Sequence, residues 1–191
     1  MKKLITLLLA MTLVLSLAAC GGGKTGEPVK DDTEGKTAVD ILNDAWAVYE
    51  EAEKFPIAGG DYTTMVSDAP GAVDVTDGET LDALLGFPAD SAGLIDDGAS
   101  MMHMMNQNTF TAGVYHVTKA DDVQAVADAI KENIMNRQWM CGFPDDLVIY
   151  SVGTNYVVAA FGAEEVVDSF ESHLEEVFAS AENLYDEDLT F

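Results

Sequence analysis

The amino-acid sequence predicts an α+β domain with two layers, in which helices cover a small, mainly antiparallel sheet. Apolar residues alternate with period two in residues 109–118, and residues 146–152 and 155–162 are runs rich in residues that favour strands. They recur at spacings of three and four in residues 121–138 and 164–181, which indicates amphipathic helices. The resulting order of strand, helix, strand, strand and helix predicts a βαββα core, because consecutive elements of a domain usually pack beside one another.

An N-terminal helix is expected ahead of this core, in residues 37–54. Thr37 is a suitable N-cap, and Asp40 follows at the spacing of a capping box. The apolar face of this helix consists of Val39, Leu42, Ala45, Trp46 and Tyr49. Glycine, proline and aspartate then interrupt the pattern in residues 55–78, where residues 62–66 are expected to form a short strand.

Short elements are expected in the middle of the chain. Residues 80–86 suggest a helical turn that Gly86 and Pro88 end, and residues 89–97 a second short helix.

The core elements have clear apolar faces. Strand 109–118 places Phe110, Ala112, Val114 and His116 on one face and Tyr115 and Val117 on the other. Helix 121–138 has the apolar stripe Val123, Val126, Ala127, Ile130 and Ile134, with acidic residues at its positive N-terminal end. Helix 164–181 has the buried face Val167, Phe170, Leu174, Val177 and Phe178.

Two further expectations concern the end of the chain. Gly153 and Thr154 suit a type II′ hairpin turn, because glycine adopts the positive φ that the first turn position needs. The acidic residues 185–188 suggest a solvated, frayed terminus.

The charge is strongly negative. The 191 residues include 34 acidic and 9 basic ones, a formal charge of −25, and residues 37–191 account for 30 acidic and 4 basic residues. Apolar residues make up 48% of the chain, enough for a folded core. Nucleic acid is therefore excluded as a partner, whereas divalent cations, bound weakly, or a basic protein would be attracted.

The first residues resemble the leader of a bacterial lipoprotein. Lys2 and Lys3 precede an apolar run, and residues 17–20 (LAAC) are similar to a lipobox. The resemblance implies a signal peptide in residues 1–19 and a diacylglycerol on Cys20. It also implies an extracellular position on the cell membrane. The glycine-rich residues 20–36 suggest a flexible tether, and residues 37–191 a single α+β domain.

A longer segment resembles a known family. It comprises residues 101–106 (MMHMMN), the strand and helix that follow, residues 142–146 (GFPDD) and the 153–158 hairpin (GTNYVV). Together they are similar to Firmicutes lipoproteins catalogued as a domain of unknown function (DUF4358-like). The resemblance implies no catalytic residues. The central helix departs from the family's frequent lysine richness, so no shared charged partner is implied.

The most unusual string surrounds His103. An imidazole and the thioethers of Met102 and Met104 suit Cu(I). The alternative is a strand whose methionines fill the core. In an extended segment Met102 and Met104 share one face and His103 the other, so a single strand cannot direct all these ligands to one ion.

A second weak candidate is a calcium loop. Asp74, Asp77 and Glu79 offer oxygen ligands around a glycine, but their spacing is not that of a loop that wraps one ion.

The sequence favours a protein that is not an enzyme and needs no cofactor. Cys141 could pair with His116 or His103, but a free cysteine among apolar neighbours is more often a small buried residue. Ser91 lies in a segment one residue short of a nucleophile elbow, and no strand is expected before it.

Two functions remain open. The first is a lipid-anchored binding or protein-interaction domain at the cell envelope, and the second an accessory lipoprotein that binds a small solute or cation for a transporter. A pocket lined by Tyr62, Trp139 or Tyr156 would favour the second, and an exposed apolar patch the first.

Overall fold

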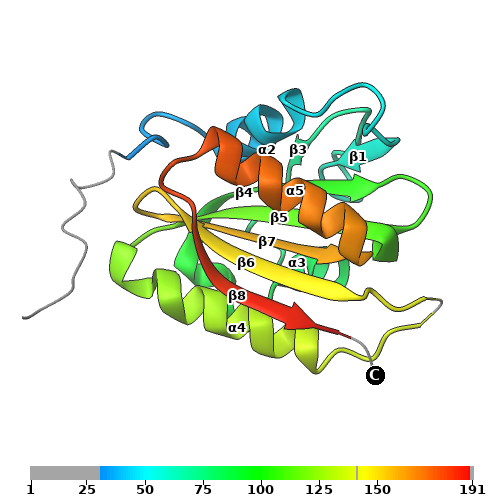
Figure 1. Cartoon of the computed structure of the whole chain (residues 1–191). Coiled ribbons are helices and arrows are strands. Elements are labelled where there is room, and N and C mark those ends of the chain that lie inside the picture. The colour runs from blue at the N-terminus through cyan, green and yellow to red at the C-terminus, as the bar shows by residue number, and fades with distance from the viewer. Residues whose placement is uncertain (1–30, 141, 190–191) are drawn as a thin grey trace, which may run out of the picture.

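The computed structural model describes residues 31–140 and 142–189, which form an open antiparallel sheet of eight strands with helices on both faces (Figure 1). The strands are β1 (Ile57–Gly59), β2 (Val66–Ser67), β3 (Gly71–Ala72), β4 (Ile95–His103), β5 (Phe110–Val117), β6 (Asp146–Val152), β7 (Tyr156–Gly162) and β8 (Glu182–Asp188). Their order is β2-β1-β4-β5-β7-β6-β8, and β3 pairs with β4. The α+β class and the antiparallel sheet are thus confirmed.

Within the described residues, four α-helices and three short 3-10 helices precede or connect the strands. They are α2 (Ala38–Ala47), α3 (Gly78–Leu85), η1 (Ala89–Leu94), η2 (Gln107–Thr109), η3 (Ala120–Asp122), α4 (Val123–Met135) and α5 (Glu164–Val177). Helices α2 and α5 pack on one face of the sheet, while α3 and α4 pack on the other (Figure 1).

The sheet is therefore covered on both faces, and the prediction of two layers is wrong in this respect. Alternate residues of each central strand enter two separate apolar cores. Met101 and Phe110 face α2 and α5, whereas Met102 and Tyr115 face α3 and α4. All seven residues of β7 are buried, as expected of a strand with packing on both sides.

The predicted N-terminal helix is confirmed, with an earlier end. Thr37 caps α2 through a complete capping box with Asp40, and the helix ends at Ala47 instead of residue 54. The following Glu50 and Glu53 form turn hydrogen bonds that do not continue the helix.

The segment between α2 and β5 differs from expectation. The predicted strand 62–66 is a turn for most of its length, because the carboxylate of Asp61 accepts hydrogen bonds from the amides of Thr63 and Thr64. The predicted helix 89–97 is a 3-10 helix that ends at Leu94, and the buried Ile95 begins β4.

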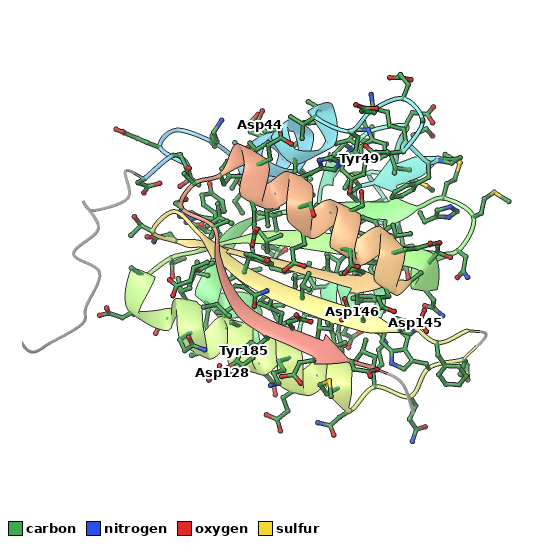
Figure 2. All side chains as sticks on the ribbon, in the orientation of Figure 1. Asp44, Tyr49, Asp128, Asp145, Asp146 and Tyr185 are labelled. Atoms are coloured by element: carbon green, nitrogen blue, oxygen red, sulfur yellow. The ribbon has the colours of Figure 1, made fainter. Side chains whose placement is uncertain are left out.

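The predicted frayed terminus 185–188 is wrong, since these residues belong to β8. This strand pairs with β6 from Ser151↔Glu182 to Asp146↔Asp188. Tyr185 turns toward α4, where its hydroxyl lies 2.5 Å from Asp128 (Figure 2). Packing against the helix thus holds an acidic strand at the edge of the sheet.

The β6–β7 hairpin has a three-residue loop, 153–155, in place of the predicted two-residue turn. Gly153 has φ +60°, as expected of a turn glycine. A Cβ at this position would lie 2.2 Å from Oγ1 of Thr33, so the glycine also admits the N-terminal segment.

Residues 31–36, expected within the tether, contact the domain at this hairpin. Thr154 donates a hydrogen bond to Asp31 over 2.7 Å, and Tyr156 donates to the carbonyl of Lys36 over 2.6 Å. The predicted signal peptide and Cys20 lie outside the described residues. Within the described residues, no helix has both the length and the apolar composition needed to cross a membrane.

Candidate functional site: an acidic groove between α5 and β8

A cavity of about 540 Å³ opens between α5 and the paired ends of β6 and β8. Its lining is made of carboxylates from these elements and the segments beside them: Asp145, Asp146, Glu164, Asp168, Asp186 and Asp188. We call this cavity the acidic groove. Figure 2 shows Asp145 and Asp146 at the end of β6 that points away from the hairpin.

Strand and helix periodicity explain why these side chains converge. In β6, Leu147 faces α4, so Asp146 faces α5. Asp188 pairs directly with Asp146 across the strands and Asp186 with Val148, so both share that face. Glu164 and Asp168 lie one turn apart at the start of α5.

Asp146 is the central group of the groove. Only 8% of this residue is exposed. Its Oδ1 accepts a hydrogen bond of 2.8 Å from the amide of Leu147. Burial raises the pKa of Asp146 to about 6, and the negative charges of Asp186 and Asp168 add to this effect.

The carboxylates continue along α5 toward the hairpin. The hydroxyl of Tyr150 donates to Glu171, and a carboxylate oxygen of Glu175 lies 2.9 Å from the same hydroxyl. Asn183 of β8 donates to Glu171 over 3.0 Å. Burial, together with these carboxylates, raises the pKa of Tyr150 well above its ordinary range, so its proton stays in place.

The described residues that line the groove include no lysine, arginine or histidine. Lys131 of α4 is engaged on the opposite face of the sheet, where it pairs with Glu187 of β8 and lies over the Tyr185 ring. Arg137 donates to the carbonyls of Asp82 and Ala83 at the end of α3. The N-terminal end of α5 offsets only part of the repulsion.

Exposed apolar side chains occur at the same end of the sheet. They belong to the β4–β5 loop and the α4–β6 loop and are Met104, Met105, Met140 and Phe143. We call these four residues the end patch. Met140 and Phe143 belong to the segment that precedes Asp145, so this half of the patch is close to the groove along the chain.

The residues of the copper hypothesis are not brought together. Met102 is buried on the α3 and α4 side of the sheet. His103 stacks on Phe55, with ring centroids 5.4 Å apart. Its Nδ1 accepts from the amides of Met105 and Asn106, and Met104 is 45% exposed.

The carboxylates of the calcium hypothesis have local structural partners. Asp74 accepts from the amide and hydroxyl of Thr76, and Asp77 caps α3 by accepting from Thr80. Glu79 instead borders a different cavity of about 450 Å³ between α3 and α4.

The residues considered for catalysis lie apart. His116 pairs with Asp96 over 2.5 Å and packs on Tyr156 at the hairpin end of the sheet, whereas His103 is at the other end of β4. Ser91 lies in η1. Cys141 lies outside the described residues.

The acidic groove is not predicted by the sequence pattern. Acidic residues recur at spacings of three and four in α5, and β8 ends on three consecutive acidic residues, Asp186, Glu187 and Asp188. These carboxylates converge only through the pairing of β8 with β6, whereas the sequence predicts that residues 185–188 fray.

No group of three or more His, Cys, Asp or Glu residues in the described part of the chain is arranged to hold a metal ion. Comparisons with protein-family models, curated proteins and solved structures find no match. The resemblance to the lipoprotein family therefore stays a prediction, and the groove itself carries the functional argument.

Proposed function

We propose that the protein is a non-enzymatic binding domain at the cell envelope, anchored through a lipid on Cys20, and that it binds a basic protein through the acidic groove. The observation that carries this proposal is the buried Asp146 within a ring of five further carboxylates. Burying a carboxylate without a cation is unfavourable, and a positive partner would relieve that penalty.

The charges also favour a partner with several positive groups. The lining carboxylates come from two strands and a helix and are spread along the groove, so a segment with several lysines or arginines can contact them together. The remaining negative surface would steer such a partner toward the domain.

The position of the N-terminal segment is compatible with an anchored domain. Asp31 contacts the hairpin at one end of β6, and Asp146 lies at the other end. The seven residues of β6 separate them by roughly 20 Å. A lipid on Cys20 would leave the groove open toward a partner.

Calorimetric titration with hexalysine tests the binding step. The whole protein is placed in nanodiscs of zwitterionic lipid, and the Asp168→Asn/Asp186→Asn variant is compared with Asp121→Asn/Glu132→Gln. The second pair removes equal charge from exposed sites on the α4 side. We expect the groove variant to weaken binding about fivefold or more and the control less than about twofold. If both variants bound hexalysine equally weakly, this result would contradict specific binding in the groove.

The anchoring step has a separate test. Cys20→Ser is expected to release the protein from the membrane fraction of cells that express it, and full retention of this variant would contradict lipid anchoring.

The volume of the groove favours a second candidate, a lipoprotein that binds a small organic cation for a transporter. In that case spermidine, titrated into the same protein, would bind as tightly as hexalysine. The Asp168→Asn/Asp186→Asn variant would bind spermidine more weakly than the unchanged protein. Weaker binding of spermidine would favour the protein partner.

A further inference from the structure

We propose that the end patch and the acidic groove form one interface, and that its occupant is a protein segment carrying large apolar side chains beside its basic residues. This inference rests on the proposed function and names the partner's chemistry more closely.

The end patch is strongly exposed. Met105 and Met140 are 80% and 81% exposed, and Phe143 is 64% exposed. Single exposed apolar residues are common, but several long, adaptable side chains from two loops at one end of a domain mark an interaction surface.

The two loops are held together by polar contacts. The side-chain amide of Asn108 donates to the carbonyl of Gly142 over 2.9 Å. The amide of Ala163 donates to the carbonyl of Thr109 over 3.0 Å, which joins the β4–β5 loop to the start of α5. The apolar side chains thus sit on one supported end of the molecule.

The same contacts connect the patch to the groove. Phe143 is two residues from Asp145, whose amide donates to the carbonyl of Gly162 over 2.7 Å. Glu164, another groove residue, follows shortly after Gly162 in the chain. A bound segment can therefore place basic side chains in the groove and apolar ones on the patch.

Charge complementarity selects this occupant over a lipid surface. An anionic bilayer would be repelled by the six carboxylates beside the patch. A basic segment is attracted by them, and its apolar residues would remove the methionines and Phe143 from water.

Two synthetic peptides of equal length and equal lysine content test the inference. One alternates lysine with leucine and the other lysine with serine. Both are titrated into the whole protein in zwitterionic nanodiscs, and binding to empty discs is subtracted. We expect the lysine–leucine peptide to bind about tenfold more tightly.

The variant Met105→Ser/Phe143→Ser should reduce this preference to about twofold or less while leaving the affinity for the lysine–serine peptide unchanged. The matched control is Tyr62→Ser/Met65→Ser. These residues are 65% and 68% exposed on the β1–β2 turn, which is held by Asp61 and Ser100. The control should keep the full preference.

Equal affinity of the unchanged protein for both peptides would overturn the inference, as would an unchanged preference in the Met105→Ser/Phe143→Ser variant. Tighter binding to anionic vesicles than to the lysine–leucine peptide would also overturn it. If the lysine–serine peptide did not bind the unchanged protein at all, this result would instead contradict the proposed function of the groove.

Discussion

The side chain of Asn108 donates a 2.9 Å hydrogen bond to the carbonyl of Gly142, and this contact links the β4–β5 loop to the α4–β6 loop. If the link orders the end patch, Asn108→Ala should loosen both loops while costing only about 1 kcal/mol of global stability. Hydrogen exchange should become faster in residues 104–109 and 139–143. Unchanged exchange in both loops would show that the bond does not order the patch.

Asp146→Asn should stabilise the protein in a pH-dependent way. Because the pKa of Asp146 rises from 3.8 to about 6 on folding, the folded state holds this proton more tightly than the unfolded chain. The associated stability is complete below about pH 4 and is lost as the pH rises through 6. Asparagine never acquires the charge.

Chemical denaturation should therefore show little difference between Asp146→Asn and the unchanged protein at pH 4. At pH 7.5 we expect an advantage of up to about 2 kcal/mol for the variant. Asp121→Asn, at an exposed site, serves as the control and should show no such trend. If Asp146→Asn raised the free energy of unfolding equally at pH 4 and pH 7.5, this result would contradict a raised pKa of Asp146.

Asp61 should stabilise the β1–β2 turn with the opposite pH dependence. Burial raises its pKa, but hydrogen bonds from the amide of Asp74 and from the amide and hydroxyl of Thr63 outweigh this effect, so the pKa lies below its ordinary range. A depressed pKa contributes stability above about pH 4, and that contribution is lost as the pH falls further.

Asp61→Ala leaves these donors unsatisfied and should cost about 2–3 kcal/mol at pH 7. The free energy of unfolding, measured from pH 7 to pH 2, should show a shrinking difference between the two proteins. A difference that grows toward low pH would be inconsistent with the depressed pKa.

Gly153→Ala should detach the N-terminal segment from the hairpin. Alanine is strained at φ +60°, and its Cβ would lie 2.2 Å from Oγ1 of Thr33. We expect a loss of about 1–2 kcal/mol and faster hydrogen exchange in residues 31–36.

Gly93→Ala is the matched control, because a Cβ there meets no atom within 4 Å. It should leave stability nearly unchanged. Equal effects of the two substitutions would mean that the contact between Gly153 and Thr33 is not responsible.

Periodicity sufficed for the elements whose apolar faces are regular. Strand β5, helix α4 and helix α5 form in the predicted segments, because alternation and three-four spacing follow directly from backbone geometry. The two helices end earlier than predicted, at Met135 instead of residue 138 and at Val177 instead of residue 181. The capping box of Thr37 and Asp40 could also be predicted, because it depends only on residues close together in the sequence.

The remainder depends on tertiary contacts. An acidic segment such as 182–188 becomes a strand only because β6 supplies hydrogen bonds and α4 supplies a surface for Tyr185. The third layer was missed because β7, buried throughout, shows no single preferred face. The groove was missed in turn, since Asp146 meets Asp186 and Asp188 only once β8 is paired.

Mapping the contact sites of a cationic probe tests the central claim, that the groove between α5 and β8 is the binding surface. A zero-length carbodiimide can couple hexalysine to carboxylates of the whole protein in nanodiscs, and mass spectrometry can locate the links. We predict that they concentrate at Asp168, Asp186 and Glu164 and vanish in high salt. Links that appear equally at exposed sites such as Asp121 and Glu132 would contradict the claim.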